Sequence, residues 1–237
     1  MKAMILAAGR GERMRPLTDH TPKPLLQAGG KPLIVWHIER LVQAGIVELV
    51  INHAHLGTQI EQVLGDGGNL GARIIYSDEG TALETAGGIA FALAHLGEQP
   101  FAVINGDIYC EYDFARLPDL AEQMSRRADH AHLVMIDNPT HHPNGDFCLN
   151  LDRVIAAASC PDPHRQLLTF SGIGLYQPSI FSTIQRGSRE PLAPLLRDQI
   201  ALDKVSGEHY RGLWVDVGTP QRLTDLDSLL RSKHNAI

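Results

Sequence analysis

Residues 1–15, MKAMILAAGRGERMR, place an apolar run directly before a loop that is rich in glycine and arginine. Residues 3–8 have the length and the continuous apolar character of a strand that is buried on both faces. Gly9 and Gly11 let the backbone N–H groups of the loop approach a bound ligand closely. A buried strand that runs into such a loop is typical of nucleotide-binding α/β proteins, and the rest of the chain is interpreted from it.

The first half of the chain alternates short apolar runs with helical patterns. Further strands are predicted at residues 48–52, 73–76 and 101–105, and helices are predicted to begin at Pro32, Gly57 and about Ile89. This alternation predicts an α/β fold with a doubly wound, mainly parallel sheet that is covered by helices on both faces. Ligands of such sheets bind at the carboxyl ends of the strands, so the segments that follow these strands are expected to converge on one crevice.

The second half of the chain is less regular. Strands are predicted at residues 133–136, 172–176 and 213–217, and a last helix is predicted after Thr219 and Pro220. We expect one domain over residues 1–237, with a nucleotide-binding half at about 1–110 and a smaller lobe at about 139–208 laid over the crevice.

Composition excludes several classes of protein. The formal charge of −6 and the apolar fraction of 43% indicate a globular protein that is neither a general nucleic-acid binder nor a polybasic membrane-surface protein. The three cysteines are an odd count without metal-ligand spacing, which favours a reducing cytoplasm and no disulfides. We expect no signal peptide and no membrane span, and the lack of an assembly repeat favours a monomer.

The loop after the first strand concentrates positive charge. Arg10, Arg13, Arg15 and Lys23 lie within fourteen residues and are suited to binding phosphate oxygens, so a triphosphate is the expected ligand. The loop lacks the Gly-Lys-Ser/Thr end of a P-loop and the third glycine of a dinucleotide fingerprint. The alternative is a solvated surface turn, and three nearby prolines count against it because they stiffen the segment.

Two aspartates follow predicted strands. Asp107 comes after the strand at residues 101–105, and Asp216 ends the strand at residues 213–217. Carboxylates at this edge of the sheet could hold Mg²⁺ against phosphate oxygens. The alternative for each alone is a turn or helix cap, and their occurrence together with the basic loop favours the metal site. Two histidine pairs, His53 with His55 and His130 with His132, lack the further ligands that a zinc site needs. No nucleophile elbow supports covalent catalysis.

The motifs together resemble those of a known family. Residues 6–18, LAAGRGERMRPLT, and 22–25, PKPL, are similar to the signature of the sugar-1-phosphate nucleotidylyltransferases, the nucleotide sugar pyrophosphorylases of the EC 2.7.7 class. The similarity continues in the family's order through LETAGG at 83–88, NGD at 105–107 and DVGTP at 216–220. The short chain and INHAHLG at 51–57 most resemble the N-acetylmuramate-1-phosphate uridylyltransferases of peptidoglycan recycling.

The resemblance implies a reaction and a set of site residues. A nucleoside triphosphate and a sugar 1-phosphate would give a nucleotide sugar and pyrophosphate, with UTP, N-acetylmuramic acid α-1-phosphate and Mg²⁺ as the implied ligands. The fold would be Rossmann-like, of the glycosyltransferase-A type, and the lobe at about 139–208 would bind the sugar. The implied nucleotide-binding residues are Ala8, Gly9, Gly11, Glu84, Gly87 and Gly88. The implied catalytic residues are Arg15 and Lys23, the implied sugar-binding residues are Asn105, Gly145, Ser171 and Gly172, and the implied metal ligands are Asp107 and Asp216.

The chain departs from the family pattern at one place. Many relatives carry a Glu-Lys-Pro whose lysine contacts the sugar phosphate, whereas residues 156–163 here read AAASCPDP. The residue that contacts the sugar phosphate is therefore open. Because glycine loops do not specify a base, guanylyl, thymidylyl or uridylyl transfer to mannose or glucose 1-phosphate also stays open. A non-catalytic nucleotide-sugar-sensing subunit is a further alternative, but the retained Arg15, Lys23, Asp107 and Asp216 count against it. A nicotinamide-dependent oxidoreductase is disfavoured by the missing third glycine.

Overall fold

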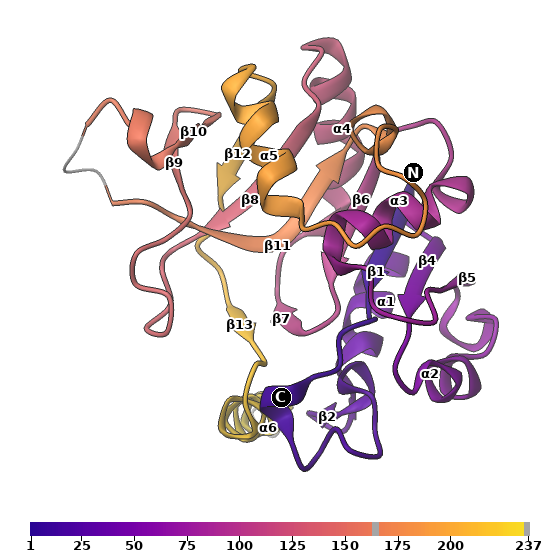
Figure 1. Ribbon diagram of the computed structural model, residues 1–237. Helices are drawn as coiled ribbons and strands as arrows, with labels where there is room; N and C mark the ends of the chain where they lie inside the picture. Colours follow the sequence, from indigo (N-terminus) through magenta and orange to yellow (C-terminus); the bar gives the residue numbers. More distant parts are fainter. Residues whose placement is uncertain (163–165, 235–237) are drawn as a thin grey trace.

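The computed structural model describes residues 1–162 and 166–234, and a nine-stranded sheet forms its centre (Figure 1). In spatial order, the strands are β5 (Arg73–Asp78), β4 (Glu48–His53), β1 (Lys2–Leu6), β6 (Phe101–Asn105), β11 (Thr169–Tyr176), β8 (Ala131–Ile136), β12 (Val205–His209), β10 (Arg153–Ala156) and β9 (Phe147–Asn150). The α-helices are α1 (Leu33–Gln43), α2 (Gly57–Leu64), α3 (Glu84–Leu96), α4 (Leu117–Arg126), α5 (Leu192–Ala201) and α6 (Pro220–His234).

The strand directions confirm the predicted fold class. Strands β5, β4, β1 and β6 are parallel to one another, while β11 runs antiparallel to both β6 and β8. The chain order reverses between β1 and β6, because β4 and β5 follow β1 on one side and β6 lies on the other. Their carboxyl ends therefore open on a crevice of the kind in which doubly wound sheets bind ligands.

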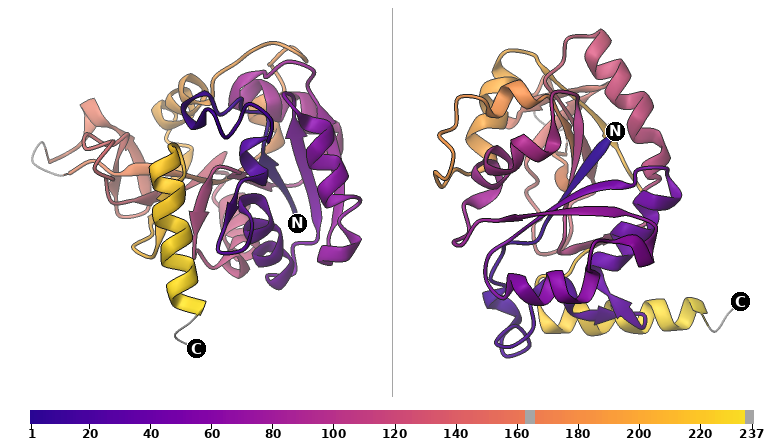
Figure 2. Two further views of the ribbon diagram at one scale, coloured as in Figure 1. Left: turned by 90° about the horizontal axis from the view of Figure 1, so that it is seen from below. Right: turned by 90° about the vertical axis from the view of Figure 1, so that its right-hand side faces the viewer.

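Alternation along β1 explains why helices cover both faces of the sheet. Ala3 and Ile5 point into a core with α1, α2 and α4, whereas Met4 points into a second core with α3 and α5. All three side chains are fully buried. Successive strand residues face opposite sides, so a strand that is apolar throughout must be covered twice. The two layers of helices are visible on either side of the sheet in Figure 2.

A third apolar cluster anchors the C-terminal helix. Leu223, Leu226 and Leu230 of α6 pack with Met14 and Val217, and α6 also contacts the short strand β2 (Gln27–Ala28), which pairs with β3 (Lys31–Pro32). As predicted, Thr219 caps α6, since its hydroxyl accepts a hydrogen bond from the Arg222 N–H at 3.3 Å. Helix α6 thereby holds the N-terminal loop and the segment around Asp216 on the same side of the molecule (Figures 1 and 2).

The predicted helices and strands differ most from those of the structure at α3 and in the second half of the chain. Helix α3 begins at Glu84, five residues before the predicted start, because Gly87 and Gly88 lie inside the helix. Glu84, the first residue of the helix, has a left-handed backbone conformation with a φ of 62°. The sequence reasoning missed α4, α5, β7 (Ile108–Cys110), β9, β10 and β12. The strand predicted at residues 213–217 is present as β13 (Trp214–Asp216), which pairs with β7.

The expectation of no disulfides is wrong for one cysteine pair. Cys148 on β9 is joined to Cys160, with the two Cα atoms 5.8 Å apart, because β10 reverses the chain between them. Cys110 is free and buried, and burial raises the pKa of its thiol to about 11. Pro163, the last residue of the AAASCPDP segment, lies outside the described residues.

None of the helices in residues 1–162 and 166–234 combines the length and the apolar character needed to cross a membrane.

Candidate active site

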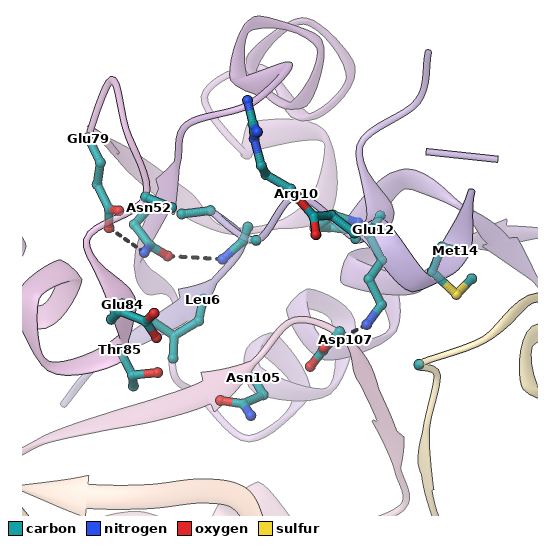
Figure 3. Close-up of a pocket in the computed structure, with 18 of the residues that line it drawn as sticks. Leu6, Arg10, Glu12, Met14, Asn52, Glu79, Glu84, Thr85, Asn105 and Asp107 are labelled. Carbon is teal, nitrogen blue, oxygen red and sulfur yellow. Dashed lines mark hydrogen bonds and ion pairs between the residues drawn. The ribbon is translucent and has the colours of Figure 1, made fainter. Parts of the chain in front are cut away.

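A cavity of about 560 Å³ opens at the carboxyl ends of β1, β4 and β6, where the sequence predicted a crevice (Figure 3). Its walls come from the loop after β1, from the ends of β4, β5 and β6, and from the start of α3. The predicted residues that line it are Ala8, Gly9, Gly11, Lys23, Glu84, Asn105 and Asp107. Separate predicted segments therefore meet at one site.

The basic side of the cavity is formed by Arg10, Arg13 and Lys23. The Lys23 side chain is only 8% exposed, and its Nζ lies 2.6 Å from Asp107 Oδ2. A buried ammonium needs such a partner, because burial without one carries a large desolvation cost. Gly11 is required here: its φ is 65°, and a Cβ would lie 2.9 Å from the Thr18 methyl group. The glycine lets the loop fold back against Thr18 and Lys23.

The opposite side is formed by two residues that were not predicted as site residues, Asn52 and Glu79 (Figure 3). Asn52 Oδ1 accepts a hydrogen bond from the Ala7 N–H at 2.9 Å, and its Nδ2 donates to Glu79 Oε1 at 2.6 Å. Glu79 Oε2 also accepts from the Leu83 N–H at 2.9 Å. Burial raises the pKa of the Glu79 carboxyl above its usual value. The position of Asn52 at the end of a predicted strand was the available signal.

Gly87 and Gly88, predicted to line the base and ribose pocket, lie one layer behind the lining. A Cβ on Gly88 would lie 2.4 Å from Glu79 Oε1 and 3.0 Å from Asn52 Nδ2, so this glycine makes room for that pair. A Cβ on Gly87 would lie 2.3 Å from the Ser188 carbonyl oxygen. Gly87 therefore serves the packing of a neighbouring segment against α3.

A second cavity of about 410 Å³ adjoins the first and shares Arg13, Asn105 and Asp107 with it. The predicted residues Ser171 and Asp216 line it, together with Ile108, Pro139, His141, His142, Thr169, Phe170 and Trp214. The histidines come from the segment that connects β8 to β9. The two cavities thus meet at a charged junction.

Two further residues predicted to face the sugar lie outside the lining. Gly172 has a φ of 82° at an irregularity in β11, and a Cβ there would lie 2.6 Å from Asn105 Nδ2. It therefore lies directly behind a residue that lines both cavities. Gly145 lies against Asn138 and Leu167 and borders neither cavity.

The two predicted metal ligands lie near one another. Strand β13 pairs with β7, and the Val217 N–H donates to the Asp107 carbonyl oxygen at 3.0 Å. Two carboxylates are the donor type that Mg²⁺ prefers when phosphate oxygens and water complete its shell. Within the described residues, no group of three or more His, Cys, Asp or Glu side chains could hold a metal ion alone. A cation held by Asp107 and Asp216 would therefore need further oxygen ligands from a substrate or water.

The structure does not place Arg15 at the site. Its side chain is 67% exposed, its Nε lies 3.3 Å from Asp19 Oδ1, and it lines neither cavity. Arg13 lines both. The short 3-10 helix at Glu12–Met14 explains why the two arginines differ. Met14 is buried in the apolar cluster with α6, while Arg13 before it lines the cavities and Arg15 after it is exposed.

Fold and site together define an α/β protein with a basic, glycine-containing loop and a carboxylate pair beside the switch point of its sheet. The chain belongs to the nucleotidyl transferase family, whose model matches residues 2–233. It is therefore an enzyme of the nucleotidyltransferase class, as the resemblance implied.

The relatives support this assignment. The chain is 53% identical to the N-acetylmuramate alpha-1-phosphate uridylyltransferase of Neisseria meningitidis serogroup B, with 97% of this chain and 98% of that protein covered. It is 35% identical to the enzyme of the same name from Caulobacter vibrioides, with 92% of each covered. A mannose-1-phosphate guanylyltransferase of Mycobacterium tuberculosis is 31% identical over 92% of this chain and 61% of its own length.

A solved structure supports the fold. The crystal structure of a protein named a putative glucose-1-phosphate thymidylyltransferase from Bacillus anthracis matches with a TM-score of 0.83 and 23% identity. It covers 98% of this chain and 95% of its own.

Buried His37 gives the site a pH-dependent support. Its Nε2 donates to the Ile108 carbonyl oxygen at 2.7 Å, directly after Asp107, and burial lowers the pKa of the ring to about 4 from the ordinary 6.5. Between these values the unfolded chain binds a proton that the native ring does not. The stability contributed by neutral His37 should therefore fall by about 1.4 kcal/mol per pH unit as the pH drops from about 6.5 to about 4.

The measurement is urea unfolding of the wild type and His37→Gln between pH 7 and pH 4.5. The wild type should lose stability more steeply with falling pH than the variant does. Parallel curves would show that the ring is not held neutral.

Proposed function

We propose that the protein transfers a uridylyl group from UTP to N-acetylmuramic acid α-1-phosphate and releases UDP-N-acetylmuramic acid and pyrophosphate. The observation that carries this proposal is the junction of the two cavities at Arg13, Asn105 and Asp107. A triphosphate in the first cavity and a sugar phosphate in the second would bring their phosphates together there. Transfer between two phosphates needs such an alignment more than it needs covalent chemistry from the protein.

The choice of base and sugar rests on the relatives. The uridylyltransferase of Neisseria meningitidis shares 53% identity over nearly the full length of both chains, whereas the Mycobacterium tuberculosis guanylyltransferase is matched over only 61% of its length. We therefore favour UTP and N-acetylmuramic acid α-1-phosphate, and a role in peptidoglycan recycling follows from that sugar. Cytoplasmic location and a monomeric state remain predictions of the sequence.

The charges of the first cavity suit the two ends of a nucleotide. Arg13 and Lys23 would bind the triphosphate, in place of the pair Arg15 and Lys23 expected from the sequence. Asn52 and Glu79 would meet the base or ribose, because their amide and carboxylate groups can bond to the donors of that end. Glu84 would lie beside them at the start of α3.

The chemical step is an in-line displacement at the α-phosphorus. A phosphate oxygen of the sugar forms the new bond, the bond from the α-phosphorus to the bridging oxygen breaks, and the electron pair leaves with pyrophosphate. Arg13 and Lys23 neutralise the charge that develops on the leaving group. We propose that Asp107 and Asp216 hold Mg²⁺, which supplies further positive charge to the phosphate oxygens when bound.

Pyrophosphate release from a matrix of nucleoside triphosphates and sugar 1-phosphates tests the reaction. The largest kcat/KM is expected for UTP with N-acetylmuramic acid α-1-phosphate. A preference for GTP with mannose 1-phosphate would contradict the substrate proposal, and no release from any pair in the presence of Mg²⁺ would sink the catalytic proposal.

Arg13→Ala and Arg15→Ala form a matched pair that tests the arginine assignment. Loss of a charge-stabilising contact in the transition state typically lowers kcat by on the order of a hundredfold to a thousandfold. Arg13→Ala should show such a loss, while Arg15→Ala, which removes an exposed surface ion pair, should stay within about threefold of wild type. A large loss in Arg15→Ala with Arg13→Ala nearly unaffected would reverse the assignment. Circular dichroism would confirm that both variants fold.

A further inference from the structure

Arg222, on the first turn of α6, contacts residues that line the second cavity. Its side chain is 21% exposed, and its Nη1 lies 2.6 Å from Asp216 Oδ2 and 2.9 Å from His141 Nε2. Its Nε also lies 3.4 Å from the Thr219 hydroxyl. Asp216 and His141 line the second cavity, so the guanidinium lies next to the expected sugar-phosphate site.

Gly218 shows how closely the guanidinium approaches the first cavity as well. This glycine lines the first cavity, and a Cβ on it would lie 2.5 Å from Arg222 Nη2 and 3.0 Å from Asp216 Oδ2. A side chain at residue 218 would force the arginine or the aspartate to move. Arg222 therefore occupies space between the nucleotide cavity and the sugar cavity, although it lines neither.

The contact with Asp216 conflicts with metal binding at the same carboxylate. Arg222 stays protonated at any pH at which the protein is folded, so it cannot release Asp216 by losing its charge. Asp216 Oδ2 is further approached by His141 Nε2 at 3.2 Å. A divalent cation on this oxygen would meet the guanidinium at short range and would be repelled. Arg222 and a metal ion therefore compete for Asp216.

We propose that Arg222 is a movable phosphate-binding residue. It occupies Asp216 while no metal is bound there, and it turns to the phosphate of the acceptor sugar 1-phosphate when a divalent cation takes its place. The planar guanidinium can bind two phosphate oxygens at once. The movement is short, because the second cavity begins at the residues that Arg222 already contacts. For the identity of the acceptor, this inference rests on the proposed function.

The second cavity would otherwise lack an arginine for the acceptor phosphate. Arg13, the arginine in its lining, is assigned to the triphosphate. Arg222 brings a permanent positive charge from α6 to residues that line the same cavity.

The alternative is that Arg222 only holds Asp216 in position for the metal. The two roles predict opposite changes in metal affinity. Removing a competitor should strengthen metal binding to the protein alone, whereas removing a support should weaken it. The test therefore compares Arg222→Gln with the wild type, and with Arg231→Gln as the control, since Arg231 lies on the same helix and is paired with Asp227 at the exposed surface.

The first measurement is Mn²⁺ binding to the full chain without nucleotide, followed by electron paramagnetic resonance. Arg222→Gln should bind Mn²⁺ more tightly than wild type by roughly threefold to tenfold, in line with loss of one competing ion pair. Arg231→Gln should match the wild type. Weaker or unchanged Mn²⁺ binding in Arg222→Gln would overturn the competition.

The second measurement is steady-state pyrophosphate release. Arg222→Gln should raise the KM for the sugar 1-phosphate by on the order of tenfold to a hundredfold, the usual effect of losing a charged hydrogen-bond pair. The KM for UTP should stay within about twofold, and Arg222→Lys should recover part of the loss. An unchanged KM for the sugar 1-phosphate would overturn the phosphate contact. If the wild type releases no pyrophosphate, the proposed function fails, while the Mn²⁺ measurement still decides the competition.

Discussion

In the protein alone, the rest of the site depends on the ion pair between Lys23 and Asp107. The Lys23 side chain is almost fully buried and lies 2.6 Å from the carboxylate that follows β6. Because a buried ammonium without a partner is strongly unfavourable, the long loop after β1 is fixed to the end of β6. This attachment closes one side of the first cavity and places Arg10 and Arg13 at its wall.

The same arrangement recurs at the second carboxylate. Asp216 is held by Arg222 as Asp107 is held by Lys23, so each expected metal ligand bonds a cation of the chain. Each of these two ion pairs is balanced in charge, and Arg13 adds a positive charge at the junction. Under the proposed function, a triphosphate that arrives with a divalent cation would give each side chain a new partner of opposite charge, and substrate binding would become an exchange of partners. Such exchange limits the cost of burying charge before and after binding.

Site residues could be predicted best from the sequence where they lie directly at the end of a predicted strand. The strands β1, β4 and β6 were predicted from continuous apolar runs, and Asp107 and Asp216 were placed at the site because each lies at the end of a strand. The family resemblance implied Arg15 and left Arg13 unassigned, whereas Arg13 lines both cavities, because sequence alone does not show which side chain a three-residue 3-10 helix turns toward a cavity. Glu79 and Arg222 escaped notice because their positions depend on contacts with residues distant in space. The pairing of Cys148 with Cys160 likewise follows from the reversal at β10, which the sequence did not reveal.

The central claim is that the two carboxylates exchange the chain's own cations for a metal ion when the nucleotide binds. A crystal structure of the full chain with UTP and Mg²⁺ tests it most directly. We expect Mg²⁺ to contact Asp107 and Asp216 in that complex. The 2.6 Å contacts of Asp107 with Lys23 and of Asp216 with Arg222 should be broken, and Lys23 Nζ should contact a phosphate oxygen. A complex in which UTP fills the first cavity while both ion pairs remain intact would contradict it.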